Sequence, residues 1–458
     1  MRFDRAMSDA ESLMWRLEKD PYLSSTFGAA MLLDRAPDVA AMKRRLTRTS
    51  HVIPRLHQHV APAPGGVAPP LWVDDPDFDI DYHVRRIACP KPGHLRDALD
   101  LAVQVVGDPF DRTRPLWQYV VIEGLRGGKS IVLQKMHHTL TDGERGVELS
   151  MQYLDFERDA AEPPDLDGDA ATPADEPAEP GPLDAARDFV AGGLRLPIGV
   201  AREVRHLLAE PTAIPDATTA AVRTIKAIAA QLGDTAAARS PLWTQRSLHR
   251  GFETLRVPFR STKDASARLG GTINTAFLTA AAHAAGRYHD ELGEPVGELR
   301  ASMAVSTRTE ESGSNAFSLV KLTVPTEAMP IGDRFRLVET AIGEARSMSP
   351  TAGLDALAAL TVALPTSLLT RIARQQTQTV DFATSNLRGS PIPMFLAGAQ
   401  ILAVYPIGPL LGVAFNATLM SYLGDLDIGV TIDTAAISEP ELLGQCLTEA
   451  FRELARAR

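Results

Sequence analysis

The sequence predicts a two-lobed α/β protein, and three observations carry this prediction. The chain has 458 residues, which is more than one hydrophobic core usually supports. An acidic, proline-rich stretch divides it after roughly its first third. Helix-type and strand-type hydrophobic patterns occur on both sides of that stretch, without a regular βαβ repeat or a GxGxxG turn. A doubly wound nucleotide-binding fold is therefore disfavoured.

The dividing stretch, residues 159–184, has the composition of a solvated linker. It holds nine acidic residues and no Lys or Arg, and it is rich in Pro, Ala and Gly. Because the net charge of the chain is −10, the remainder is nearly neutral. This charge argues against a nucleic-acid partner. We therefore expect an N-terminal lobe over 1–158, an acidic linker and connecting helix over 159–215, and a C-terminal lobe over 216–458.

In the first lobe, hydrophobic spacing predicts a strand, a helix and a hairpin. Phe78, Ile80 and Tyr82 alternate with aspartates, which predicts a half-buried strand within 70–88. Apolar residues at helical spacing predict a helix over 93–111. The two apolar runs LWQYVVIEGL and SIVLQKMHH, separated by RGGK, predict a β-hairpin with a glycine turn.

In the second lobe, residues 273–289 carry one apolar face and predict a helix, with Thr272 or Asn274 as its cap. Residues 412–433 form two strand-like runs around a Leu-Gly-Asp turn. The apolar stretch 354–373 is interrupted by Asp355 and Pro365, which indicates a core or surface-associated helix instead of a membrane span.

The N-terminal residues and the cysteines predict a cytoplasmic protein. The N-terminal residues mix charged and apolar side chains and lack the apolar run of a secretory signal. Cys89 and Cys446 are too far apart for a CxxC pair, so we expect two buried thiols.

Residues 135–143, KMHHTLTDG, are the strongest candidate for chemistry. If the run before them is a strand, the side chains of His137 and His138 point to opposite faces and cannot have the same role. Asp142 and Gly143 follow at the expected start of a helix, where Asp142 is near the N-cap. One histidine is thus expected to face a cavity and the other to pack.

Other interpretations of this stretch are a plain helix cap, a metal site and a hydrolase triad. Asp142 alone is more often a cap than a catalytic group. A metal would need further clustered ligands, which the sequence does not place nearby. A hydrolase of the GxSxG type is disfavoured because that motif is missing. A histidine without a partner nucleophile indicates general-base chemistry on the substrate itself.

The stretch His137–Gly143 matches the HHxxxDG motif, and the chain resembles the bacterial wax ester synthase/diacylglycerol acyltransferase family within the CoA-dependent acyltransferase superfamily. Pro115, Leu116 and Trp117 stand where that family carries its PLW motif. The blocks WVDDPDFDIDYHVRR, SNLRGSPIPMFLAGAQILAVYPIGP and LMSYLGDLDIG are also similar to family blocks. The resemblance extends over most of the chain.

The resemblance implies a mechanism. His138 is the general base that takes the proton of an acceptor hydroxyl while its oxygen attacks the thioester of a fatty acyl-CoA, with no acyl-enzyme. An unperturbed imidazole pKa of about 6.5 suits this role. Asp142 has an orienting role through an arginine, for which Arg308 is our candidate, against the alternative of a solvated loop charge. His137 fixes the strand end, and Gly143 permits the turn into the helix.

Further site residues follow from the same resemblance. Ser385 and Asn386 match a family Ser-Asn block and are candidate donors to the developing oxyanion. Asn274 stands where the family has Asn-Asp, but Thr275 replaces the aspartate, which suggests a changed acceptor preference or a purely structural pair in which Asn274 caps the helix. Asn315 is a weaker match to a family Gly-Asn position. Trp117 is expected mainly to fill the core beneath the hairpin.

The implied architecture is a two-lobed chloramphenicol-acetyltransferase-like fold with a tunnel between the lobes. The implied activity is O-acyl transfer from acyl-CoA, a co-substrate, to a fatty alcohol or diacylglycerol, with no cofactor and no metal. Two alternatives stay open: the same chemistry on a sugar, polyketide or secondary-metabolite hydroxyl, and a non-catalytic acyl-CoA- or lipid-binding paralogue. We expect a monomer or weak dimer with peripheral contact to a membrane or lipid droplet. The basic cluster KRRLTR, 43–48, is a weak candidate for contact with the CoA phosphates.

Overall fold

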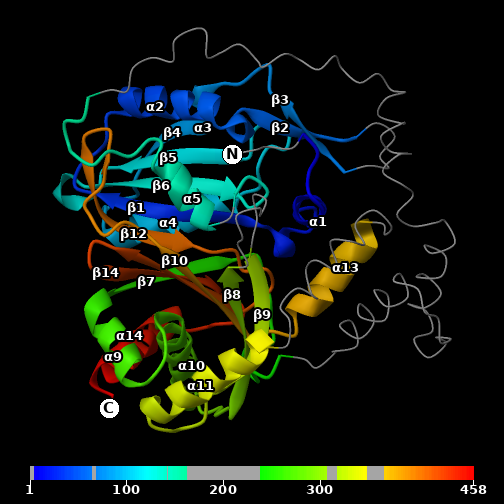
Figure 1. Ribbon diagram of the computed structural model, residues 1–458, viewed down its shortest axis with the longest axis vertical. Helices are drawn as coiled ribbons and strands as arrows, with labels where there is room; N and C mark the ends of the chain where they lie inside the picture. The colour runs from blue at the N-terminus through cyan, green and yellow to red at the C-terminus, as the bar shows by residue number, and fades with distance from the viewer. Residues whose placement is uncertain are drawn as a thin grey trace, which may run out of the picture.

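The computed structural model describes residues 5–63, 69–141, 143–161, 238–306, 317–347 and 366–457. Two mixed six-stranded sheets form the cores of two lobes, which lie one above the other in Figure 1. The two-lobed α/β fold expected from the sequence is thus confirmed.

The first lobe is a sheet covered on both faces. Its hydrophobic core lies in two layers, one with the helix α4 (Leu95–Gly107) and the other with the helix α2 (Val39–Val52). In the order of the sheet its strands are β11 (Phe395–Leu396), β12 (Ala399–Ile407), β1 (Thr26–Leu33), β6 (Ser130–His137), β5 (Trp117–Glu123) and β4 (Val84–Ala88). A separate two-stranded sheet, β2 (Gln58–Ala61) with β3 (Leu71–Asp74), lies beside it (Figure 1).

The second lobe packs its helices against a second sheet. The strand order is β7 (Arg250–Pro258), β14 (Asp425–Asp433), β13 (Phe415–Tyr422), β10 (Phe382–Arg388), β8 (Glu298–Ser306) and β9 (Phe317–Pro325). Helices α9 (Phe259–Arg268), α10 (Ile273–Glu291), α11 (Ile331–Ser347) and α14 (Pro440–Arg456) bury one apolar cluster with these strands. The expected 273–289 helix and 412–433 strand pair are confirmed as α10 and the antiparallel pair β13–β14.

One strand pair crosses between the lobes. Strands β11 and β12 fall within the range expected for the C-terminal lobe, yet they pair into the sheet of the first lobe through β1. Strand β12 also packs against β13 and β14 of the second sheet. The backbone N–H of Val404 donates to the Asp427 carboxylate over 2.8 Å. The two lobes therefore share β12 as a common element.

Two expectations for the first lobe have different outcomes. The hairpin and the 93–111 helix are confirmed by the antiparallel β5–β6 pair and by α4. The single alternating strand within 70–88 is wrong: after β3 the chain forms a short helix, α3 (Ile80–His83), before β4. Asp79 caps this helix by accepting from the N–H of Asp81 over 2.8 Å. The aspartates that suggested alternation thus serve local caps and turns.

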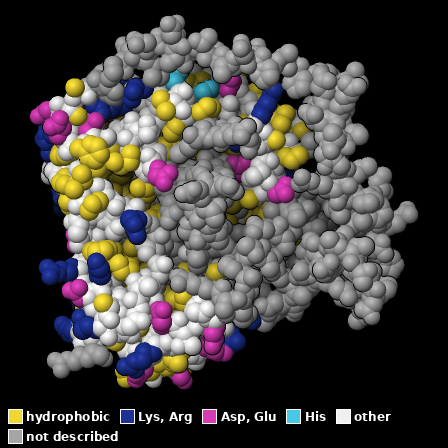
Figure 2. Space-filling view, viewed as in Figure 1, with side chains coloured by type: hydrophobic (Ala, Val, Ile, Leu, Met, Phe, Trp, Pro, Cys, Tyr) yellow, Lys and Arg dark blue, Asp and Glu magenta, His cyan; other side chains and the backbone are white. Residues whose placement is uncertain are grey.

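Two helices outside the lobe cores lie against each other. Helix α1 (Asp9–Leu17) contacts α13 (Thr366–Thr377), where Leu369, Ile372 and Ala373 are buried. This described end of the 354–373 stretch therefore buries its apolar residues, and residues 354–365 lie outside the described residues. On the face seen in Figure 2, acidic and basic side chains of the described residues are interspersed.

Candidate functional site

The HHxxxDG motif begins at the end of a central, fully buried strand. Strand β6 lies between β1 and β5, and all of its residues are buried. Its last residue, His137, donates its backbone N–H to the carbonyl of Leu116 over 3.1 Å. The PLW motif and the histidine pair are therefore hydrogen-bonded neighbours at the same end of the hairpin. Helix α5 (Gly143–Ser150) starts at the glycine of the motif.

The ring of His137 is held at both nitrogens. The backbone N–H of Thr139 donates to Nδ1 over 3.1 Å, so Nδ1 is an acceptor. The Thr139 hydroxyl lies 2.8 Å from the same atom. Nε2 therefore carries the proton and donates it to the Glu18 carboxylate over 3.0 Å. With 1% of its surface exposed and both nitrogens engaged, His137 is a structural residue at the strand end.

Glu18, which directly follows α1, is a site residue that no sequence motif indicated. Its carboxylate also accepts from the Ser24 hydroxyl over 2.6 Å and from the Ser25 N–H over 2.7 Å. Burial opposes ionisation of this group, but the hydrogen bond and electrostatic attraction of the His137 ring, with the donors of Ser24 and Ser25, outweigh it and lower the pKa of Glu18 to about 2. Glu18 is therefore a carboxylate at any physiological pH.

His138 is half-buried and occupies a different environment from His137. Its backbone N–H donates to the carbonyl of Ser25 over 3.1 Å, so Ser25, whose own N–H donates to Glu18, also fixes the second histidine. Its ring packs against Phe27 of β1, with centroids 4.5 Å apart at an interplanar angle of 36°. The two histidines thus differ: His137, the last residue of β6, is locked in the core, and His138, in the turn that follows, is half-buried. That His138 faces a cavity stays a prediction.

The second lobe meets the motif through β10. Helix α5 packs against this strand, which carries Ser385 and Asn386, both half-buried. The side-chain amide of Asn386 donates to the Oδ1 of Asn274 in the first turn of α10. The structure therefore brings Asn274 of α10 together with Asn386 of β10, the strand that packs against the motif helix α5.

Thr275 has a structural role. Thr272, and not Asn274, caps α10, and Thr275 completes a capping box with it, so the expected cap at Asn274 is wrong. The Thr275 side chain has 1% exposure, and its hydroxyl donates to the Glu339 carboxylate of α11. A buried hydroxyl held in this way fixes α10 against α11.

The PLW motif is part of the core. Pro115, Leu116 and Trp117 are all buried. The Trp117 indole N–H donates to the carbonyl of Leu56 over 2.7 Å, and its ring stacks on His83 with centroids 4.2 Å apart. Burial of the ring lowers the pKa of His83 to about 4. This neutral histidine and the tryptophan form one aromatic stack beneath the hairpin.

Three predicted residues, Asp142, Arg308 and Asn315, lie outside the described residues. The orienting pair of Asp142 and Arg308 thus stays a prediction. Both cysteines are buried free thiols, as expected.

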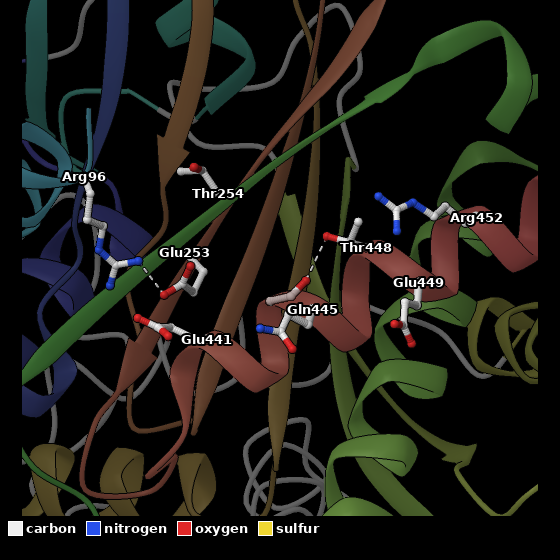
Figure 3. Close-up of a pocket in the computed structure, with 9 residues that line it drawn as sticks. Arg96, Glu253, Thr254, Glu441, Gln445, Thr448, Glu449 and Arg452 are labelled. Atoms are coloured by element: carbon white, nitrogen blue, oxygen red, sulfur yellow. Dashed lines mark hydrogen bonds and ion pairs between the residues drawn. The ribbon is translucent and has the colours of Figure 1, made fainter. Parts of the chain in front are cut away.

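A polar groove of about 560 Å³ lies away from these residues (Figure 3). It is bordered by Arg96 of α4, by Glu253 of β7 and by one side of α14, and Arg96 and Glu253 form an ion pair of 2.6 Å across the lobes. Its lining is mainly charged, and a charged lining is unsuited to a long acyl chain. The groove contains no residue of the histidine site. The groove therefore does not suit the lipophilic substrates that the sequence implies, and the histidine pair stays the candidate site.

Two further properties concern the described residues as a group. They contain no set of three or more His, Cys, Asp or Glu side chains positioned to hold a metal ion. None of the helices built from them combines the length and hydrophobicity needed to cross a bilayer.

The fold and site define a class: two α/β lobes with the HHxxxDG motif at a strand end, the arrangement expected of the CoA-dependent acyltransferase superfamily. Residues 7–277 match the wax ester synthase/diacylglycerol acyltransferase catalytic domain, and residues 313–455 match the C-terminal domain of the same family. The chain belongs to the wax ester synthase/diacylglycerol acyltransferase family and is an acyltransferase of that family.

Curated relatives agree with this assignment, and solved structures share the fold. A Mycobacterium tuberculosis H37Rv protein that bears the name diacylglycerol O-acyltransferase is 33% identical over 99% of this chain and 92% of its own length. A second M. tuberculosis protein of that name, tgs1, is 26% identical over 95% of this chain and 92% of its own. The wax ester synthase/diacylglycerol acyltransferase from Marinobacter aquaeolei VT8 has the same fold, with a TM-score of 0.68, 22% identity and 98% coverage of both chains. The first condensation domain of the calcium-dependent antibiotic synthetase shares the fold with a TM-score of 0.57, at 15% identity and over 98% of this chain and 95% of its own.

Proposed function

We propose that the protein transfers a long-chain acyl group from acyl-CoA to the hydroxyl of a fatty alcohol or diacylglycerol, with His138 as the general base. The observation that carries this proposal is the division of roles between the two histidines. Because both nitrogens of His137 are engaged by Thr139 and Glu18, His138 is the imidazole suited to proton transfer. Its half-buried ring at the end of β6 is compatible with that role.

The proposed reaction is a direct displacement. His138 takes the hydroxyl proton while the oxygen attacks the thioester carbonyl, and the intermediate collapses with loss of CoA thiolate, which recovers the proton from His138. Ser385 and Asn386 are our candidates for hydrogen-bond donors to the intermediate's oxyanion, an interaction that typically contributes about 2.7–4 kcal/mol. No covalent acyl-enzyme and no cofactor enters this scheme.

Thr275 does not favour a different acceptor class. Its hydroxyl is buried and donates to Glu339, which supports a role in helix packing. We therefore retain the lipophilic acceptors and treat other hydroxyl acceptors as an outcome of the assay. We also propose peripheral contact with a membrane or lipid droplet and a monomeric or weakly dimeric state, which liposome flotation and analytical ultracentrifugation test directly.

The test of the proposed function is thiol release from palmitoyl-CoA with hexadecanol or a diacylglycerol, comparing the native protein with His138→Ala. We expect acceptor-dependent release that falls about a hundredfold or more in the variant, because a positioned base contributes about 10²–10⁴ in rate. Near-UV circular dichroism shows whether the variant keeps the native fold. Equal release by both proteins removes His138 from the chemistry. Binding of acyl-CoA without release, with any acceptor, favours a non-catalytic binding protein.

A further inference from the structure

Two cations at the junction of the lobes have no role in the scheme above. Lys135 lies on β6, on the same face as His137, and only 2% of the surface of this residue is exposed. Arg250 is the first residue of β7 in the other lobe and is half-buried. They meet at the end of α4: the Lys135 ammonium donates to the carbonyl of Asp108 over 2.8 Å, and a Cβ at Gly107 would lie 3.6 Å from the Arg250 guanidinium.

The end of α4 explains only part of this arrangement. The C-terminus of a helix favours positive charge, and the Asp108 carbonyl gives Lys135 one acceptor. The Arg250 backbone pairs with Asp433 of β14, but none of the five N–H donors of its side chain makes a hydrogen bond or ion pair to another described residue. A half-buried guanidinium without a fixed acceptor can exchange bound water for the oxygens of a phosphate.

Three carboxylates, Glu18, Asp108 and Asp433, act electrostatically on Arg250. Asp108 is exposed to solvent, whereas the other two are engaged elsewhere. Glu18 is bonded to His137, Ser24 and Ser25, and Asp433 accepts from Ser247 and the Ala435 N–H. Their acceptor oxygens therefore serve their own segments, and the Arg250 donors stay available to a ligand.

The position also allows a ligand to arrive. Gly107 and Asp108 are exposed, so the end of α4 is open to solvent. Lys135 precedes His137 by two residues on the same strand, and the charge of Glu18 reaches both Lys135 and Arg250. Burial lowers the pKa of Lys135 to about 8, which leaves it mostly protonated at neutral pH. The basic cluster at 43–48, in contrast, has its own partners: Lys43 pairs with Asp81, and Arg45 pairs with Asp155.

We propose that Arg250 and Lys135 bind a phosphate group of the acyl donor at the junction of the two lobes. This inference rests on the proposed use of acyl-CoA and deepens it by naming the side chains that select a phosphorylated thioester. Arg250 provides the planar pair of N–H donors that matches phosphate, and Lys135 adds a fixed positive charge beside it.

The test compares donors with and without phosphates. With palmitoyl-CoA, Arg250→Gln should raise KM about ten- to a hundredfold while kcat changes less than about threefold, because the loss of a hydrogen bond to a charged group weakens binding by about that factor. With S-palmitoyl-N-acetylcysteamine, which has no phosphate, the same variant should behave as the native protein. The matched control is Arg260→Gln, at an arginine of α9 whose side chain is 93% exposed. It should leave KM and kcat unchanged with both donors.

Direct binding separates this inference from the proposed function. Isothermal titration calorimetry with CoA, 3′-dephospho-CoA and pantetheine, on the native protein, Arg250→Gln and Lys135→Met, reports the subsite without catalysis. Native protein that binds CoA but shows no turnover leaves the phosphate site standing and removes the acyltransfer proposal. An equal KM change for both donors, or CoA binding unaltered in folded Arg250→Gln, overturns the subsite. A loss confined to CoA against 3′-dephospho-CoA assigns the 3′-phosphate, and an equal loss with both assigns the diphosphate.

Discussion

At the residue scale, the site depends on one buried carboxylate. Glu18 connects the end of α1 to His137 directly and to His138 through the Ser25 backbone. A carboxylate that accepts the Nε2 proton of a histidine fixes its tautomer and ring orientation. We therefore regard Glu18 as a positioning residue, which sets the strand end that presents His138.

Glu18 also predicts a pH dependence of stability. Its pKa is near 2 in the folded protein, below the ordinary value of 4.5, so the unfolded chain binds the proton more tightly. Its stabilisation is therefore complete above about pH 4.5 and is lost as the pH falls toward 2. At pH 7, Glu18→Gln should lower the free energy of unfolding by roughly 2–3 kcal/mol, and the difference from the native protein should shrink between pH 4.5 and 3.

Urea unfolding at several pH values measures this difference. Glu294→Gln, at an exposed carboxylate, is the control and should leave stability unchanged. A deficit in Glu18→Gln that stays constant from pH 7 to pH 3 would contradict the assignment of a low pKa to Glu18.

At the element scale, the hairpin that carries the histidines rests on an aromatic stack. Trp117 fills the space beneath it with 1% exposure and satisfies its N–H at Leu56. Trp117→Phe keeps an aromatic ring but removes the hydrogen bond and part of the volume, so we expect a loss of about 2–4 kcal/mol in stability. At a temperature where the variant is folded, kcat should stay within about threefold of the native value.

Thermal unfolding and initial rates on the same preparation test this separation of stability from chemistry. A variant with native stability and strongly reduced kcat would show that the tryptophan acts on substrate, contrary to its position in the core.

The elements also show what a sequence can and cannot predict. The β5–β6 hairpin, α4 and α10 follow directly from hydrophobic period and turn residues, which are local properties. The 70–88 region failed because Asp79 favours a helix cap, which competes with the strand alternation around it. Glu18 could not be found because its partner His137 is 119 positions away and no local pattern records such a contact.

At the scale of the whole molecule, the least predictable feature is the exchange of β12. Strands β11 and β12 lie between β10 and β13 in the chain, but they join the sheet of the first lobe through pairing with β1. Strand pairing depends on partners far apart in sequence, so the order of elements alone assigned residues 395–407 to the second lobe. Because β12 packs in both lobes, core packing fixes the position of one lobe relative to the other. The relative position of His138 and Asn386 is fixed in the same way.

The crossing of β12 over β14 depends on a residue without a side chain, which gives the last prediction. A Cβ at Gly429 of β14 would lie 1.9 Å from the carbonyl oxygen of Pro406 and 2.8 Å from the Phe252 ring, so Gly429→Ala must push the two sheets apart. We expect a loss of at least about 2–3 kcal/mol in stability, as for other overpacked cores. We also expect reduced activity, because the two halves of the site would no longer meet.

Gly343→Ala in α11 adds the same methyl where nothing lies within 4 Å, and should stabilise by about 0.5–1 kcal/mol through helix propensity. Chemical unfolding of the two variants decides the matter: equal and small effects would mean that the sheets can move apart freely, and that β12 does not fix the lobes.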